Sequence, residues 1–385
     1  MSNSAIARAR AALKKSKVPD QSLVLDDSIF TESLPHIPTG SLVLDYLIGG
    51  RPNKSGVAPC PGWPRGKIIQ LYGKEGAGKT TVALTACASV ASFGGSAIYV
   101  DFEHEVVPQY AATLGVPVTD DEKFLLVQPD YLEEGARYIA AFAAAGIDLI
   151  VVDSVASIQP KKLFEQKLSD IGESGRLGAV AAFWSDFLPK IKTVIAKSGT
   201  TLIGISQLRD AVNTGRSHGP DYKAQGGNAW KFYPAIRMYL RPSFKEKEKI
   251  HNSLTHSTEE VVAGFKVKAR LDKCKVSDSY YHEQEFYLRS GAGIDDLRSL
   301  IDVAEKHAII KKSGSWYTWI LPDGEEIRTQ GMSKLYDAIQ EADNGVEMLF
   351  QQVIPLLGVN VSSDDEEEHE DEDSEILDAI EDSED

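Results

Sequence analysis

The chain contains the glycine-rich stretch Gly73-Lys74-Glu75-Gly76-Ala77-Gly78-Lys79-Thr80, which is followed by Thr81. It fits the pattern G-x-x-x-x-G-K-[ST], and it lies between an apolar run at 67–72 and a helix-prone segment at 80–92. Its three glycines let successive backbone N–H groups point inward, and the following helix adds the positive end of its dipole. A glycine turn before an ordinary helix is the simpler alternative, but the flanking segments favour a phosphate-binding loop.

The side chains of this loop suit a triphosphate with Mg²⁺. Lys79 is long enough to reach the β and γ phosphates, and the hydroxyl of Thr80 is a hard oxygen ligand of the kind that Mg²⁺ prefers. The predicted nucleotide-binding set is the whole loop: Gly73, Lys74, Glu75, Gly76, Ala77, Gly78, Lys79, Thr80 and Thr81.

Strand and helix patterns alternate from residue 67 onward. The predicted strands are 67–72, 97–102, 123–128, 148–153 and 201–206. The predicted helices are 80–92, 107–114, 133–145 and 180–197. Residues 149–152 and 202–205 are uninterrupted apolar runs, which are typical of strands covered on both faces. The sequence therefore predicts the α/β class, with a mostly parallel sheet between layers of helices.

Polar residues follow the predicted strands at their carboxyl ends, where ligands bind in sheets of this kind. Asp153 is placed to hold Mg²⁺ through water, although a helix-capping Asp would occupy the same position. Glu103 is placed to polarise the water that attacks the γ phosphate, and spacing alone makes Glu105 a rival for that task. Gln207 follows the strand at 201–206 and is expected within reach of the γ phosphate.

The composition bounds the class of protein. The chain has 385 residues, of which 42% are hydrophobic, and a formal net charge of −16. Residues 364–385 hold fifteen Asp or Glu and no Lys or Arg, so the rest of the chain carries only −1, and nucleic-acid binding is not excluded. We expect that acidic block to be disordered. Three cysteines without metal spacing (Cys60, Cys87 and Cys274), no apolar signal core and no long apolar run predict an intracellular protein without a membrane partner.

With these residues in place, the chain resembles the RecA family of homologous recombination ATPases. The matching segments run in family order: 37–45, 73–81, 100–104, 150–156, 226–233 and 315–317. The segment Gly226-Gly227-Asn228-Ala229-Trp230-Lys231-Phe232-Tyr233 is far more specific than the phosphate loop, which alone indicates only a superfamily. The resemblance implies a P-loop NTPase with a RecA-like core, a short N-terminal helical arm, a small α+β C-terminal domain and an acidic tail.

Sequence pattern and resemblance together give four regions. Residues 1–36 are expected to form a basic helix and a linker, and 37–292 the ATPase core with two DNA-binding loops. Residues 293–360 are expected to form the C-terminal domain, and 361–385 the acidic tail. In the C-terminal domain, Trp316, Tyr317 and Trp319 are expected in the core rather than as platforms for bases.

The resemblance also assigns roles to individual residues. It favours Glu103 over Glu105 as the catalytic glutamate, places Tyr110 against adenine, and makes Gln207 the link between nucleotide state and the second DNA loop. Lys273 and Lys275 correspond to lysines that reach the γ phosphate of the neighbouring subunit. The DNA loops are expected within 161–177 and 208–229. Their predicted DNA-binding residues are Arg176, Arg209, Arg216, Lys223, Gly226, Gly227 and Asn228.

The function implied by the resemblance is that of a DNA recombinase that uses ATP and Mg²⁺. Such a protein forms a helical homo-oligomeric filament on single-stranded DNA, pairs it with double-stranded DNA, and acts in the cytoplasm in repair and the SOS response. Single-strand-binding protein and loading factors are its implied partners. A hexameric helicase on the same core and an accessory paralogue that regulates filaments are the alternatives.

Several departures from the family pattern indicate a divergent bacterial or phage branch. Val107 replaces the Asp that usually precedes Pro108 and contacts adenine. Ala182 occupies the position of an expected arginine, which suggests that Arg176 takes over a DNA contact. The loop at 51–64 is also longer than expected.

Overall fold

The computed structural model describes residues 32–165, 178–210, 222–252, 257–279 and 283–357. The predicted N-terminal basic helix, the acidic tail, and residues 166–177 and 211–221 of the two predicted DNA loops lie outside these ranges. Within them, no helix combines the length and apolarity needed to cross a membrane.

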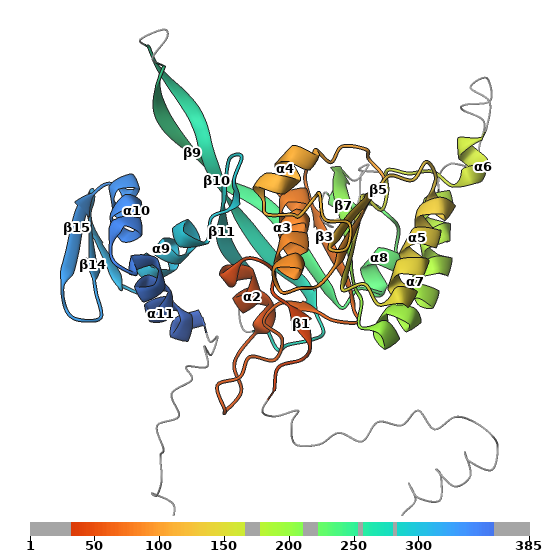
Figure 1. Ribbon diagram of the computed structural model, residues 1–385, viewed down its shortest axis with the longest axis horizontal. Coiled ribbons are helices and arrows are strands. Elements are labelled where there is room, and N and C mark those ends of the chain that lie inside the picture. Colours follow the sequence, from red (N-terminus) through yellow and green to blue (C-terminus); the bar gives the residue numbers. More distant parts are fainter. Residues whose placement is uncertain (1–31, 166–177, 211–221, 253–256, 280–282, 358–385) are drawn as a thin grey trace, which may run out of the picture.

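A ten-stranded sheet forms the centre of the molecule (Figure 1). From one edge to the other its strands are β12 (Gly293–Ile294), β11 (Glu283–Arg289), β10 (Ser257–Cys274), β9 (Ile236–Asn252), β3 (Ile68–Gly73), β7 (Thr201–Asp210), β6 (Leu149–Asp153), β4 (Ala97–Asp101) and β5 (Phe124–Val127). The tenth strand, β8 (Tyr222–Ala224), pairs with the end of β7. A separate pair, β1 (His36–Ile37) and β2 (Trp63–Pro64), joins the segments before the sheet.

The half of the sheet from β9 to β5 is parallel, and helices cover both of its faces. On one face lie α2 (Leu42–Gly49), α3 (Lys79–Ser92) and α4 (Pro108–Thr113), which share one core with the sheet. On the other lie α5 (Leu132–Ala145), α7 (Ala179–Ser198) and α8 (Ala229–Phe232), around Trp184 and Trp230. The short helix α6 (Lys161–Phe164) lies beyond α5 in Figure 1. The predicted α/β class and mostly parallel sheet are therefore confirmed.

The other half of the sheet, β9 to β12, is antiparallel and was not predicted from the sequence. β9 and β10 form a long hairpin that projects from the sheet (Figure 1). Met238, Leu240 and Leu271 point into the core shared with α3. The opposite face of these strands carries polar and aromatic residues, including Arg237, whose guanidinium lies 4.8 Å from the centre of the Tyr72 ring.

The C-terminal lobe has its own three-stranded antiparallel sheet. Its elements are α9 (Asp296–Lys306), β13 (Ile310–Ser313), β14 (Trp316–Ile320), β15 (Glu326–Gln330), α10 (Met332–Glu341) and α11 (Gly345–Leu357). Trp319 and Tyr317 are buried in the core of the lobe, as expected, but Trp316 is 41% exposed. Because side chains alternate along β14, Trp316 shares no face with its neighbour Tyr317, and the prediction of a core position for Trp316 is wrong.

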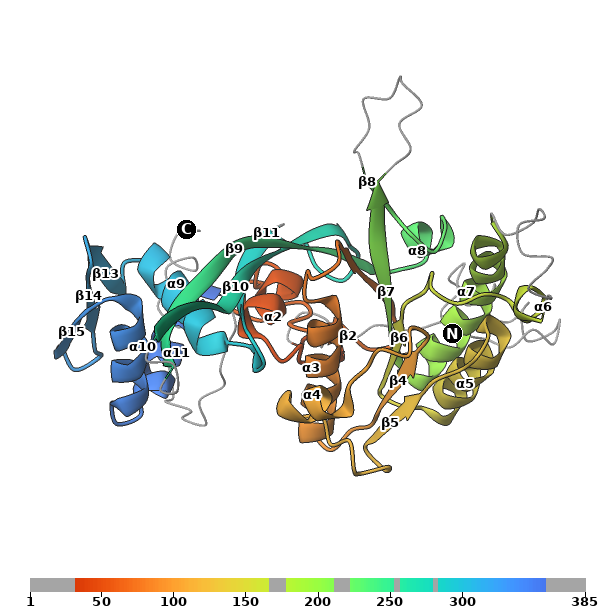
Figure 2. The same cartoon turned by 90° about the horizontal axis from the view of Figure 1, so that it is seen from above.

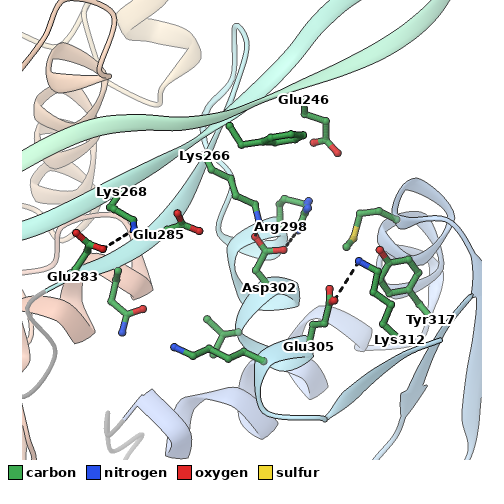
Figure 3. A pocket seen from close by; sticks show the side chains of 15 residues that line it. Glu246, Lys266, Lys268, Glu283, Glu285, Arg298, Asp302, Glu305, Lys312 and Tyr317 are labelled. Carbon is green, nitrogen blue, oxygen red and sulfur yellow. Dashed lines mark hydrogen bonds and ion pairs between the residues drawn. The ribbon is translucent and has the colours of Figure 1, made fainter. Parts of the chain in front are cut away.

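A cleft of about 880 Å³ separates this lobe from the β9–β11 face (Figure 3). Lys266 of β10 reaches across it to Asp302 of α9 at 2.6 Å, and Arg298 binds the same carboxylate. Lys268 pairs with Glu283, and Lys312 pairs with Glu305. Four of the cations lining the cleft therefore already have carboxylate partners, and one of these pairs, Lys266–Asp302, joins the core to the lobe.

Two half-buried carboxylates lie where α2 meets α9. Asp45 accepts a hydrogen bond from the backbone N–H of Thr39 at 2.7 Å, and Asp296 accepts one from that of Leu42 at 3.4 Å. Burial is the main cause that raises the pKa of Asp45 to about 8 and the pKa of Asp296 to about 6. Burial therefore favours the protonated form of both carboxyl groups relative to a free aspartic acid.

Candidate functional site

The loop at 73–80 has a backbone that its glycines make possible. Gly76 and Gly78 have φ angles of 69° and 82°, in the left-handed region that side chains disfavour. Gly73 ends β3 against the carbonyl of Leu240, where an added Cβ would collide. Ala77 is buried, and Lys79 begins α3 directly after Gly78. The loop is thus held between strand and helix in the arrangement expected of a phosphate-binding turn.

Lys79 is folded back onto this loop. Its Nζ donates a hydrogen bond to the carbonyl of Lys74 at 2.8 Å, and the residue is only 7% exposed. Burial lowers the pKa of Lys79, while the nearby carboxylates of Asp153, Glu103 and Glu75 act in the opposite direction. A multiply charged anion entering the loop would offer this ammonium group a better partner than a neutral carbonyl.

Thr80 and Asp153 meet beside the loop. The Thr80 hydroxyl donates to Oδ2 of Asp153 at 2.9 Å, and the hydroxyl of Tyr99 donates to the same oxygen at 2.6 Å. Burial is the main cause that raises the pKa of Asp153 to about 6, and Glu103 adds to it. A carboxylate and a hydroxyl are hard oxygen donors, and a cation here would offset the cost of a buried negative charge. These residues therefore fit a site for Mg²⁺.

Glu103 and Gln207 are in direct contact. Gln207 Nε2 donates to Glu103 Oε1 at 3.2 Å, and the Ser157 hydroxyl donates to the same oxygen. Gln207 is opposite Gly73 in the register of β7 and β3, so both residues lie at the nucleotide loop. Glu105 is exposed. Of the two candidate glutamates, Glu103 is therefore the one that the fold brings to the phosphate site.

Tyr110 lies at the side of α3. Its hydroxyl is 2.8 Å from Oγ1 of Thr81, the residue that follows the loop. Val107, which precedes Pro108 and α4, is 54% exposed. The Tyr110 hydroxyl thus lies beside the residue that follows the loop, and the stacking of its ring on adenine stays a prediction.

The predicted second DNA loop begins and ends on well-defined elements. β7 continues past Gln207, and the backbone of Arg209 pairs with that of Lys223 in β8. Figure 2 shows this ribbon leaving the sheet beside α8. Gly226 and Gly227 have φ angles of 99° and 88°, and exposed Asn228 precedes α8. Arg176 and Arg216 lie outside the described residues.

Lys273 and Lys275 lie away from the loop of their own chain. Lys273 is opposite Arg237 on β9, which in turn is opposite Gln70 on β3. Gln70 precedes Gly73 by three residues, so Lys273 is displaced from the loop by about 10 Å along the strand direction and lies two strands away from β3. Lys273 Nζ donates to the carbonyl of Phe232 at 2.7 Å, at the end of α8.

The surroundings of these lysines are strongly basic. Burial lowers the pKa of Lys273, and the positive charges of Lys275, Arg237 and Lys192 lower it further. Lys275 is exposed. Cations gathered in this way favour the binding of an anion.

The strand, the glycine loop, the following helix and the adjacent Asp153 define an α/β P-loop nucleotide-binding protein. The sequence profile described as the RecA N-terminal domain matches residues 5–295, and the chain belongs to the RecA family. This family comprises recombinases of homologous recombination and repair.

Curated relatives support this assignment along most of the chain. Protein RecA of Thermus thermophilus is 35% identical over 335 residues, which cover 87% of this chain and 89% of the relative. Protein RecA of Salinispora arenicola is 34% identical over 330 residues, covering 86% and 85% of the two chains. Protein RecA of Trichormus variabilis is 35% identical over 345 residues, covering 89% and 87%.

Sequence reasoning missed two hydroxyl groups at the site. Tyr99 contacts Asp153, and Ser157 contacts Glu103. Neither residue belongs to the motifs quoted for the family roles, and both reach the site only because β4 and the segment after β6 converge in space. The alternation of residues along β4 was the one available signal, since it places Tyr99 and Asp101 on the same face.

Proposed function

We propose that this chain is an ATP-dependent DNA recombinase that polymerises on single-stranded DNA, tests duplex DNA for homology and exchanges strands. The observation that carries the proposal is the continuity of β7. That strand presents Gln207 to Glu103 beside the nucleotide loop and then runs directly into the predicted second DNA loop. A single element thus connects the proposed nucleotide sensor to the predicted DNA loop, which supports coupling between nucleotide state and DNA contact.

In this proposal the loop N–H groups and Lys79 bind the triphosphate, and Lys79 exchanges the carbonyl of Lys74 for phosphate oxygens. Thr80 and Asp153 hold Mg²⁺, which when bound neutralises charge on the β and γ phosphates. Glu103 orients the attacking water and accepts its proton. Gln207 senses the γ phosphate through its amide and transmits the change along β7.

Filament formation supplies the remaining charge. Lys273 and Lys275 of one subunit reach the γ phosphate of its neighbour, so the site is complete only in the polymer. Cationic side chains supplied in trans in this manner accelerate phosphoryl transfer by roughly 10³- to 10⁵-fold in comparable enzymes. The basic surroundings of Lys273 support this assignment.

DNA is held chiefly through its phosphates. Arg176, Arg209, Arg216 and Lys223 supply the cations, and Gly226, Gly227 and Asn228 supply backbone and amide donors near the sugar-phosphate chain. We therefore expect affinity for single-stranded DNA to fall steeply as salt rises.

The test is a joint-molecule assay with purified protein, ATP, Mg²⁺, circular single-stranded DNA, and either homologous or heterologous linear duplex. We expect joint molecules with the homologous duplex alone and none with the Lys79→Ala variant. ATP-dependent unwinding without joint molecules, with rings in electron micrographs, would instead indicate a helicase. Filament binding without strand exchange would indicate an accessory paralogue.

A further inference from the structure

Tyr99 is a fully buried residue whose polar end points into the nucleotide site. It lies in the middle of β4, with 0% of its surface exposed, in the core that the sheet shares with α3. Its hydroxyl donates to Asp153 Oδ2 at 2.6 Å. A tyrosine hydroxyl buried in an apolar core carries a desolvation cost that one good partner must offset. Here that partner is the carboxylate proposed to hold the divalent cation.

The other carboxylate on this edge is engaged elsewhere. Asp101 accepts hydrogen bonds from the N–H groups of Glu103 and Val106, both at 3.1 Å, and from Gln128 Nε2 at 3.0 Å. It therefore shapes the segment that carries Glu103. The orientation of the Asp153 carboxylate depends instead on the two hydrogen bonds that it accepts, one from the Tyr99 hydroxyl and one from the Thr80 hydroxyl.

These two hydroxyl groups differ in whether a cation can reach them. The Tyr99 hydroxyl is enclosed by the core and can only stay on Asp153. Thr80 is half-buried at the first turn of α3, and because its proton is directed to the carboxylate, its oxygen lone pairs remain available to a cation. Tyr99 therefore fixes the carboxylate, and the fixed carboxylate in turn orients the hydroxyl of Thr80.

We propose that Tyr99 is a positioning residue for the divalent cation of the nucleotide site, an inference that rests on the proposed ATPase function. It acts through Asp153 and does not touch the cation. Hydrogen-bonded partners of this kind typically change metal affinity by about 10- to 100-fold when they are removed, because the ligand loses its fixed direction.

The test is Tyr99→Phe, which removes one oxygen atom and leaves the packed ring. Binding of Mn²⁺ is titrated by electron paramagnetic resonance with the full chain and a non-hydrolysable ATP analogue. We expect Mn²⁺ affinity to fall by about 10-fold or more. Affinity for the same analogue in EDTA should stay at the wild-type value, because the loop and Lys79 are unaltered.

Tyr287→Phe is the matched control. Tyr287 is also buried, at 2% exposure, and its hydroxyl also donates to a carboxylate, that of Glu246, in a cavity lined by residues of the C-terminal lobe. This variant should bind Mn²⁺ as the wild type does. In an Asp153→Asn background, Tyr99→Phe should cause little further loss, since the residue through which Tyr99 acts is already changed.

Two results would overturn the inference. Wild-type Mn²⁺ affinity in Tyr99→Phe would show that Asp153 needs no such support. Equal losses of affinity for the ATP analogue with Mn²⁺ and in EDTA would show that Tyr99 only maintains packing around the loop. The proposed function has a separate readout, because failure of the wild-type protein to bind Mn²⁺ with the analogue would remove the ATPase itself and the inference with it.

Discussion

Glu103 is the residue proposed to orient the attacking water and accept its proton. It is half-buried, and the amide of Gln207 and the hydroxyl of Ser157 both donate to Oε1. The Gln207 amide comes from β7 and the Ser157 hydroxyl from the turn after β6, and together they fix the carboxylate beside the loop before any nucleotide arrives. In the proposed role of general base, a carboxylate held in this way needs little rearrangement to accept a proton from water.

Glu103→Ala should separate binding from hydrolysis. We expect ATP and single-stranded DNA to bind normally and kcat for ATP hydrolysis to fall by about 100-fold or more, the usual contribution of a positioned general base. Glu105→Ala is the matched control, because Glu105 is exposed two residues away and should leave kcat unchanged. Rapid turnover by Glu103→Ala in a DNA-dependent ATPase assay would assign the catalytic role to another group.

The raised pKa of Asp45 predicts how the stability of the folded protein depends on pH. Burial raises the pKa of this carboxyl group to about 8, so between about pH 4 and 8 the folded state binds more protons than the unfolded state. Stability should therefore fall as pH rises through this window and level off above pH 8. Asp296, with a pKa of about 6, contributes in the lower part of it.

Thermal unfolding from pH 5 to 8.5 tests this prediction with Asp45→Asn, which keeps an acceptor for Thr39 and removes the titration. The variant should lose most of the slope and gain stability relative to the wild type at the alkaline end. Asp186→Asn, on an exposed part of α7, should retain the wild-type slope. A wild-type melting temperature that rises steadily with pH would contradict the assignment.

At the scale of elements, the parallel half of the fold could be predicted from sequence because its strands are short apolar runs. The predicted strand at 148–153 is β6 within one residue, and that at 201–206 begins where β7 begins. β7 extends to Asp210 because its end pairs with β8, a contact that local sequence does not encode. β9 and β10 escaped prediction because their charged, Lys- and Glu-rich stretches do not resemble buried strands.

The residues of the candidate site also differ in whether the sequence could predict them. Its loop and strand-end residues could be predicted because each lies in a local motif. Tyr99 could not, because its role depends on a hydrogen bond to a residue 54 positions later in the chain. Arg237 was also missed, since its contacts with Gln70 and Tyr72 arise only when β9 pairs with β3.

The contact between β7 and α8 gives a test at the element scale. An added Cβ at Gly204 would collide with the ring of Trp230, which is fully buried. Gly204→Ala should therefore lower the free energy of unfolding by about 1–3 kcal/mol, as overpacking does in rigid cores. Trp230→Phe in the same chain should restore part of the loss by freeing space. Denaturant unfolding measures both, and a fully additive double variant would contradict the proposed collision.

At the scale of the whole molecule, the register of the sheet separates two parts of the proposed active site. The loop follows the carboxyl end of β3, whereas Lys273 and Lys275 lie toward its amino end and next to α8. A head-to-tail arrangement of subunits would bring one part to the other. Activity should then depend on the polymer.

Mixing two inactive variants tests whether the site is shared. Lys275→Ala subunits keep the loop and Glu103, and Glu103→Ala subunits keep both lysines. In a random head-to-tail copolymer of equal parts, about one interface in four combines an intact half from each and should hydrolyse ATP. Lys275 is the cleaner choice, because Lys273 also binds the carbonyl of Phe232. Activity that does not rise above the sum of the separate variants would place the lysines outside the reaction.

The hydrophobic core of the C-terminal lobe includes a residue from outside the lobe. Tyr46 of α2 belongs to the same buried cluster as Trp319, Leu335 and Leu349, although some 250 residues of chain separate it from the lobe. During synthesis, α2 leaves the ribosome long before the lobe that completes its surroundings. Cleavage before α9 would therefore expose the Tyr46 ring to water on the N-terminal fragment and leave a cavity in the core of the released lobe. Limited proteolysis should thus release the lobe only as an unstable product.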